Sequence, residues 1–274
     1  MDDKNKNLAL RIASALVLLP GVIFLLLQGG FWSAVLIGAA AAICAWEYYR
    51  ITLKHLSPAA WAAVLAAFLL PLYPHLRPQS ASDLALWTIA VFFLLAWSYE
   101  LIQGPLDQAV IFASHLVTGL LYAALGLTAL SALRRGPDGL QWVFCVLIAT
   151  WGNDTCAYFV GRFLGRHKLY PEVSPHKTWE GLIGGMGGSL VGMLIARATF
   201  FPALSIGDCV AVGLAAGVVG PIGDLCESML KRAYHVKDSS QIIPGHGGLL
   251  DRIDALIFNA PIVFLYAQFV RPML

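Results

Sequence analysis

The 274-residue chain has a composition that excludes an ordinary water-soluble domain. Hydrophobic residues make up 58% of it and charged residues only 12%. Soluble domains carry about 45–50% apolar and about 25% charged residues. So few charges could not cover a surface in water, and most of the exterior is therefore expected to face lipid. The formal net charge of +2 is too small to indicate a nucleic-acid partner. The composition predicts an integral membrane protein.

Nine apolar stretches approach the roughly 20 residues that a membrane-spanning helix needs. The first could be a secretory signal, but its length and the preceding Asp2 and Asp3 favour a retained span. Pro71 and Pro74 interrupt the third. We therefore predict an all-α, polytopic integral membrane protein with about nine transmembrane helices. The predicted spans are residues 8–27, 31–46, 59–73, 84–101, 111–133, 140–160, 181–201, 206–225 and 255–270.

The placement of lysine and arginine predicts which side of the membrane each loop faces. With a cytoplasmic N-terminus, most of the 18 lysines and arginines fall in cytoplasmic loops, which predicts a multi-pass protein of the cell inner (cytoplasmic) membrane. Charge is sparse up to residue 150, whereas two charge-rich loops, 161–180 and 227–254, both fall on the cytoplasmic side. We therefore divide the chain into N-terminal lipid-facing scaffold helices, residues 1–150, and a C-terminal catalytic region, residues 151–274, with its active site facing the cytoplasm.

Two acidic residues lie inside predicted spans, where an ionisable side chain is costly and is a functional hypothesis by default. Asp154 lies in an apolar run, and Asp224 follows Pro221, which interrupts helical hydrogen bonding and can open backbone groups to a cavity. The alternative for each is a buried ion pair, for example between Asp154 and Arg162. Two such acids beside two basic loops favour a charged cavity.

Polar residues continue from Asp224 at helical spacing, through Glu227, Ser228 and Lys231, with Arg232 next in the chain. Residues three, four and seven positions apart share one helix face, so these side chains are expected to form one stripe. A solvated interfacial turn with ion pairs would be the ordinary explanation of such a run. A stripe that begins at an intramembrane aspartate fits that explanation poorly.

A glycine-rich segment, PGHGG at residues 244–248, follows this stripe. Glycines let backbone N–H groups approach an anion closely, although a plain helix connection would look similar. Asp251 and Asp254 come next, three positions apart, so a helix starting here would place both carboxylates on one face beside its positive end. Paired carboxylates with few fixed further ligands are a usual way to hold Mg²⁺ together with a substrate phosphate.

The other basic loop contains Ser174, Lys177 and Thr178 just before the seventh span. Ser174 and Thr178 are plausible helix caps, which is a purely structural role. Lys177 and the free N–H groups of the helix start would also suit a phosphate. The preference of basic residues for the cytoplasmic side explains Arg166 and Lys168 without any chemistry.

Carboxylates for a divalent cation, basic side chains for phosphates and a glycine-rich loop together indicate phosphoryl or nucleotidyl transfer at a membrane surface. The sequence contains no P-loop, no GxGxxG motif opening a soluble dinucleotide-binding unit and no HExxH motif. Its five cysteines are scattered singly and are interpreted as packing residues. A hydrolase or a zinc enzyme is therefore disfavoured.

Several of these segments closely resemble the signature of the phosphatidate cytidylyltransferase family, also called CDP-diacylglycerol synthases. In the C-terminal half they are SMLKR at 228–232, KD at 237–238, PGHGG at 244–248 and DRID at 251–254. Upstream, DTCAYFVGR at 154–162 and SPHKTWEG at 174–181 are similar to the bacterial members. The resemblance covers residues 151–254, and a motif with so many fixed positions is specific.

The resemblance implies that CTP and phosphatidate give CDP-diacylglycerol and pyrophosphate with Mg²⁺ as cofactor, and it leaves open a second, monovalent cation such as K⁺. It implies that Asp224 and Asp251, with Asp254 joining them, bind the metal and that Lys231 is catalytic. His246 could donate to substrate or simply pack the loop. The wider set expected at the substrates is Asp154, Ser174, Lys177, Ser228, Arg232, Lys237, Asp238, His246, Gly247, Gly248 and Arg252.

Two other functions fit parts of the sequence. A CTP-dependent lipid kinase acting on a polyprenol or phytol alcohol would transfer the γ-phosphoryl group and release CDP. An ion-coupled transporter would also use intramembrane acids, but it predicts inverted repeats, and none is visible in the sequence. Besides CTP and phosphatidate, the expected partners are membrane lipid and, as an open alternative to a monomer, a second copy of the chain.

Overall fold

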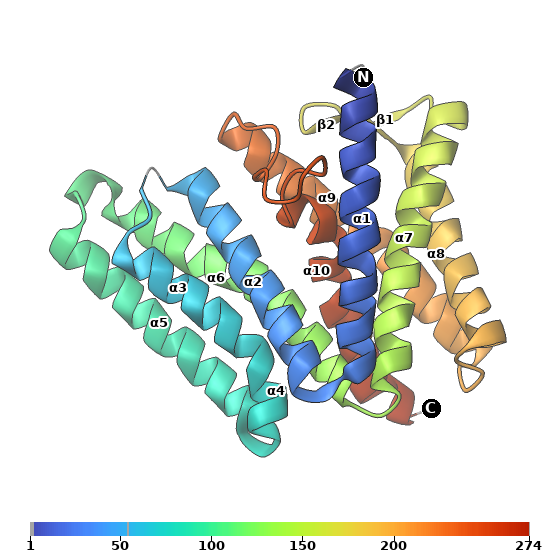
Figure 1. Ribbon diagram of the computed structural model, residues 1–274, viewed down its shortest axis with the longest axis horizontal. Coiled ribbons are helices and arrows are strands. Elements are labelled where there is room, and N and C mark those ends of the chain that lie inside the picture. The colour runs from blue at the N-terminus through green and yellow to red at the C-terminus, as the bar shows by residue number, and fades with distance from the viewer. Residues whose placement is uncertain (1–2, 54, 274) are drawn as a thin grey trace. The chain divides into compact units, whose positions relative to one another are not determined.

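The computed structural model describes residues 3–53 and 55–273, and these are mostly helical (Figure 1). A short antiparallel hairpin, β1 (Lys168–Tyr170) and β2 (Ser174–Thr178), joins two of the helices. The helices are α1 (Asp3–Gln28), α2 (Gly30–Thr52), α3 (Pro58–Leu69), α4 (Tyr73–Leu76), α5 (Ala81–Gln103), α6 (Leu106–Arg135), α7 (Gly139–Leu164), α8 (Trp179–Thr199), α9 (Ile206–Ala233) and α10 (Leu250–Leu265).

Eight helical segments within the described residues are long and apolar enough to cross a membrane. In α1, the apolar segment Leu18–Gln28 is shorter than a span. Every predicted span overlaps a helix, so the all-α polytopic membrane fold is confirmed, and the number nine is approximate. The helix exteriors are apolar, as lipid requires: Leu106 is 90% and Leu101 81% exposed.

The third predicted span shows how its prolines act. α3 ends at Leu69, a 3-10 turn covers Leu70–Leu72, and the four-residue α4 follows. Proline cannot donate to the preceding turn, so the regular hydrogen-bond ladder stops here. The Ser131 hydroxyl donates to the carbonyl of Pro71 at 2.5 Å. The sequence expectation of an interrupted span is confirmed.

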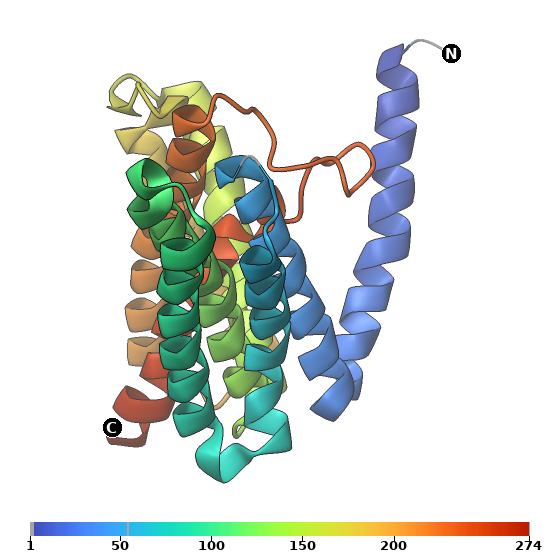
Figure 2. The same ribbon diagram turned by 90° about the vertical axis from the view of Figure 1, so that its left-hand side faces the viewer.

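The chain forms two compact units that are not contiguous in sequence. The first contains Met1–Arg135 and Tyr234–Arg252, and the second contains Gly136–Ala233 and Ile253–Leu274. In the first unit α2 packs against α3 and α6, and α5 packs against α6 (Figures 1 and 2). In the second, α7, α8 and α9 pack against one another. The functional division at residues 150 and 151 stays a prediction.

Glycines allow α7 and α8 to approach closely in the second unit. A Cβ on Gly188 would lie 2.3 Å from the carbonyl oxygen of Gly152, which is far inside van der Waals contact. Small residues at such crossings replace the hydrophobic driving force that helices in lipid lack, because they let backbones pack directly. Gly187, one residue earlier, has nothing within 4 Å of the equivalent position.

These neighbouring glycines give a matched test of the helix packing. Gly188→Ala should destabilise the folded protein by about 1–3 kcal/mol, as overpacking usually does. Gly187→Ala should leave stability unchanged or slightly raised, since alanine favours helix. Thermal unfolding of the purified variants in one detergent measures both, and equal midpoints for the two variants would contradict the close α7–α8 contact.

Candidate functional site

The second unit gathers three carboxylates around one lysine. Asp154 on α7, Asp224 on α9 and Asp254 on α10 interact electrostatically with one another and with Lys177 of β2. The Lys177 ammonium forms an ion pair with the Asp224 carboxylate, Nζ to Oδ2 at 2.9 Å. The structure therefore joins Asp154 and Asp224, the two intramembrane acids singled out in the sequence. Three negative groups facing one lysine leave an excess of negative charge.

Pro221 accounts for part of this arrangement. A proline lacks the N–H that would bond the carbonyl four residues earlier, so the carbonyl of Gly217 loses its helical donor. The Asn153 side-chain amide supplies that donor, Nδ2 to O at 3.0 Å. Because Asn153 precedes Asp154 on α7, this hydrogen bond sets the rotation of α7 beside α9. Pro221 thus interrupts helical bonding as expected, but the freed carbonyl bonds to Asn153, and its opening to a cavity stays a prediction.

A glycine brings α10 close to the same part of α9. A Cβ on Gly223 would lie 2.7 Å from the carbonyl oxygen of Asp254 and 2.9 Å from the Phe258 ring. Only a residue without a side chain permits that approach. Gly223 immediately precedes Asp224, so the close packing of α9 and α10 brings Asp224 near enough to Asp254 for the two to interact electrostatically.

The β-hairpin delivers Lys177 to the carboxylates. Thr178, directly after it, caps α8: its hydroxyl accepts a hydrogen bond from the Gly181 N–H at 3.1 Å. The structural interpretation of Thr178 is thus confirmed. Ser174 lies at the other end of β2, paired with Tyr170. Ser174 is therefore part of the hairpin and is no helix cap.

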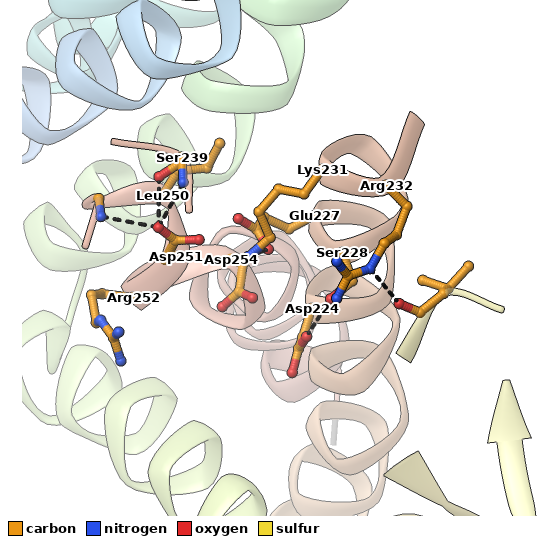
Figure 3. A network of polar contacts seen from close by, with 12 residues as sticks. Asp224, Glu227, Ser228, Lys231, Arg232, Ser239, Leu250, Asp251, Arg252 and Asp254 are labelled. Atoms are coloured by element: carbon orange, nitrogen blue, oxygen red, sulfur yellow. Dashed lines mark hydrogen bonds and ion pairs between the residues drawn. The ribbon is translucent and has the colours of Figure 1, made fainter. Parts of the chain in front are cut away.

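Arg232, near the end of α9, ties that helix to the same hairpin. Its guanidinium Nε donates to the carbonyl oxygen of Val173 at 3.4 Å (Figure 3). Arg162, the candidate ion-pair partner of Asp154, donates instead to the hydroxyl of Tyr158 on its own helix. Both arginines thus have local contacts, Arg232 with the hairpin and Arg162 with its own helix.

The polar stripe of α9 contains two internal contacts (Figure 3). The Ser228 hydroxyl donates to Asp224 Oδ1 at 3.3 Å, and the Lys231 ammonium pairs with Glu227 Oε2 at 2.5 Å. Glu227 is only 1% exposed, so this ion pair is buried and is not the solvated pair of the alternative interpretation. Lys231 is therefore held by a carboxylate in the described structure.

The glycine-rich segment, in the first unit, forms a tight turn. The N–H of His246 donates to the carbonyl of Ile243 at 2.9 Å, with Pro244 and Gly245 between them. Gly245 has φ +77° and Gly247 has φ +84°, values that favour glycine. Proline followed by a positive-φ glycine is the pattern of a type II turn. The chain then returns antiparallel to itself through the bridge between Ile243 and Gly247.

This turn borders a polar cavity of 540 Å³ whose lining includes Lys237, Asp238, His246, Gly247 and Arg252. The Arg252 guanidinium donates to the His246 carbonyl, Nε to O at 2.8 Å, and so braces the turn. Two basic side chains, one histidine and one carboxylate around a cavity of this size suit a phosphate-bearing ligand. The sequence-predicted substrate residues of this loop are thus brought together within the first unit.

Asp251 has a dense set of donors (Figure 3). Its Oδ2 accepts from the N–H of Ser239 at 2.9 Å, from the Ser239 hydroxyl at 2.9 Å and from the N–H of Gly248 at 3.0 Å. Asp251 stands in the first turn of α10, and Asp254 follows three residues later on that helix, as predicted. Asp251 belongs to the first unit and Asp224 to the second, so a metal site made of all three stays a prediction.

Sequence analysis missed Glu47, an acidic residue of α2. Its side chain is fully buried and accepts from the N–H groups of Leu249 and Leu250 at 2.9 and 2.6 Å. The same criterion that selected Asp154, a carboxylate within an apolar run, would have found it. The predicted span ended at residue 46, so Glu47 was counted with the following loop, whereas α2 continues to Thr52.

These features define a polytopic membrane protein with clustered intramembrane carboxylates and a separate anion-suited loop. The Cytidylyltransferase family matches residues 9–270. A phosphatidate cytidylyltransferase of Pseudomonas aeruginosa is 36% identical, covering 92% of this chain and 94% of its own. One from Bacillus subtilis is 32% identical over 98% of this chain and 100% of its own, and one from Synechocystis is 31% identical over 96% and 98%. The chain therefore belongs to the cytidylyltransferase family, whose members are nucleotidyltransferases.

Lys177 gives a test of the carboxylate cluster. Lys177→Gln removes the positive group that faces Asp224 and leaves the acids uncompensated, so kcat/KM should fall about tenfold or more, because hydrogen bonds to charged groups contribute about 1.5–3 kcal/mol. The measurement is cytidylyl transfer by purified protein in mixed micelles.

Lys168→Gln is the matched control, since Lys168 lies in the same hairpin and is exposed. It should keep near-wild-type activity. Equal kcat/KM for the two variants would show that the hairpin lysine near the acids has no special role.

Proposed function

We propose that this protein is a phosphatidate cytidylyltransferase. The phosphate of phosphatidate attacks the α-phosphorus of CTP, the bond from that phosphorus to the bridging oxygen breaks, and CDP-diacylglycerol and pyrophosphate result. The observation that carries the proposal is the cluster of Asp154, Asp224 and Asp254 around Lys177, in a chain that matches named phosphatidate cytidylyltransferases over nearly its whole length.

The chemistry requires charge compensation more than acid–base catalysis. A phosphate monoester has its second pKa at about 6, so the nucleophile is already ionised near neutral pH. The difficulty is to bring this dianion to the α-phosphorus of a polyanionic triphosphate. Positioning and electrostatic stabilisation are therefore the main contributions expected from the protein.

The proposed cofactor is Mg²⁺, bound by Asp224 and Asp254 and by the sequence-predicted Asp251. Carboxylate oxygens are the ligands Mg²⁺ prefers, and it usually keeps several waters, so few protein ligands suffice. Within the described residues, no three His, Cys, Asp or Glu side chains already converge in a metal-holding geometry. When bound, Mg²⁺ neutralises phosphate charge. A second, monovalent cation such as K⁺ remains part of the proposal.

The chain's own residues would divide the remaining work. Lys177 pairs with Asp224 in the structure and would exchange that contact for a phosphate oxygen of the substrate. Lys237 and Arg252 line the polar cavity with His246, where they would bind the anionic part of CTP. Lys231 would act only after loosening its contact with Glu227.

The remaining predicted substrate residues have mostly supporting contacts in the described structure. Ser228 orients Asp224, and Arg232 braces the hairpin. Gly247 and Gly248 give the loop its backbone shape. We propose that the site lies at the cytoplasmic face of the inner membrane, because CTP comes from the cytoplasm while the phosphatidate head group stays at the bilayer surface.

The decisive assay follows labelled CTP, phosphatidate and Mg²⁺ in mixed micelles and measures the lipid product and pyrophosphate together. Asp224→Asn and Asp254→Asn should each abolish product formation in folded protein, because each loses a charged ligand. Chelation of Mg²⁺ should do the same to the wild-type protein.

Asp107→Asn is the control, an exposed acid in the first turn of α6 that should remain fully active. Near-normal activity in both site variants would contradict the metal assignment. Release of CDP in place of pyrophosphate would instead identify a CTP-dependent lipid kinase.

A further inference from the structure

Glu47 is a buried carboxylate with no part in the reaction chemistry above, and it holds the start of α10. Its side chain accepts from the Ser240 hydroxyl at 2.5 Å and from the N–H groups of Leu249 and Leu250 at 2.9 and 2.6 Å. The first N–H groups of a helix have no acceptor within it and carry partial positive charge. A carboxylate from α2 thus satisfies them and fixes where α10 begins.

Glu47 is also linked to Asp251 through one hydroxyl group. Ser239 Oγ lies 3.3 Å from Glu47 Oε2 and 2.9 Å from Asp251 Oδ2. A serine hydroxyl has one proton and can donate to only one of these carboxylates at a time. A change at Glu47 therefore alters the hydrogen bonding of Asp251, although the two carboxylates belong to different helices.

The loop backbone packs closely against these side chains. A Cβ on Gly248 would lie 1.8 Å from Ser239 Oγ and 2.6 Å from Glu47 Oε1. The loop backbone therefore lies directly against the Glu47 carboxylate. Loss of that carboxylate would remove the surface on which the end of the loop rests.

The beginning of the same loop is anchored next to Glu47. The Tyr234 hydroxyl lies 2.7 Å from His115 Nε2, and His115 Nδ1 lies 3.3 Å from the Tyr48 hydroxyl. The next residues along fix α2 to α6, because the Tyr49 hydroxyl of α2 donates to the Leu116 carbonyl of α6 at 2.6 Å. The substrate loop is thus held at its end by Glu47 of α2 and at its beginning by His115 of α6, which in turn contacts Tyr48 beside Glu47.

We propose that Glu47 is a positioning residue for cytidylyl transfer. By binding Ser240 and the first N–H groups of α10, it holds the loop of residues 237–249 and the Asp251 carboxylate in the geometry that CTP and its cation require. This inference rests on the proposed roles of Asp251 and of the loop cavity. Glu47 acts through these residues and does not itself contact the reacting atoms.

The test is Glu47→Gln, which keeps the size of the side chain but replaces an acceptor oxygen with an N–H₂ donor facing existing donors. In protein without substrate or metal, hydrogen exchange of the amides at 239–250 should become about tenfold faster, since hydrogen bonds to a charged group contribute at least that factor. The KM for CTP should rise about tenfold, with a smaller change in kcat. A loss of folded protein alone would lower the apparent kcat and leave KM unchanged.

Two variants serve as comparisons. Glu47→Asp keeps the charge on a shorter side chain and should recover part of the lost affinity for CTP. Ser33→Ala changes another fully buried polar residue of α2, whose hydroxyl donates only to the Gly30 carbonyl of its own helix. Ser33→Ala should match the wild-type protein in both exchange and kinetics.

Wild-type exchange at 239–250, or a wild-type KM for CTP, in Glu47→Gln would overturn the inference. Should that variant fail to fold, Ser240→Ala removes one of the same hydrogen bonds from the loop side. Ser240→Ala must also raise the exchange rate at 239–250 and the KM for CTP. Wild-type values of either quantity in Ser240→Ala would overturn the inference as well. Asp251→Asn separates the proposed role of Asp251 from the positioning role of Glu47. Full activity in Asp251→Asn would refute the proposed site. An inactive Asp251→Asn together with wild-type kinetics in Glu47→Gln would refute only the positioning role.

Discussion

The structure depends on one constraint, which is that negative charge within membrane-spanning helices must be compensated locally. Water and mobile counter-ions are absent from a lipid environment, so an isolated carboxylate there is costly. Asp154, Asp224 and Asp254 share a single lysine on a short hairpin. Their negative charge therefore exceeds the positive charge that the protein supplies to the cluster. This excess of negative charge supports the proposal that a cation binds here.

The same constraint is met differently at Glu47. There, fixed N–H and O–H donors surround the carboxylate, and every donor belongs to the loop or to the start of α10. These fixed donors satisfy Glu47, which acts as a structural anchor. A carboxylate balanced by one flexible lysine can exchange that partner. The type of compensation thus separates Glu47 from Asp154, Asp224 and Asp254. Asp251, which is also proposed for the metal, resembles Glu47 in accepting from fixed donors of the loop.

The sequence was most informative where a residue conflicts with its surroundings. Asp154, Asp224 and Pro221 were identified because each is unfavourable in an apolar helix, and the structure gives each a specific partner or consequence. Lys177 and Thr178 were correctly placed beside a helix start. The apolar stretches located the spans but set the end of α2 too early, and this concealed Glu47. No local pattern could show that residues 234–252 pack with α2 and α6, because the bonded positions are 119 residues apart for Tyr234 and His115 and 203 apart for Leu250 and Glu47.

The contacts of His246 bear on its role. The sequence left it open between a donor to substrate and a loop-packing residue. Its N–H closes the turn, its carbonyl receives Arg252, and its ring Nδ1 lies 2.9 Å from the Ser14 hydroxyl. The backbone of His246 and one of its ring nitrogens therefore have structural hydrogen-bond partners. Since the phosphate nucleophile is already ionised and needs no base, the reaction does not demand more of this histidine. Its main contribution is therefore the shape of the loop, through which Arg252 and Lys237 reach the cavity.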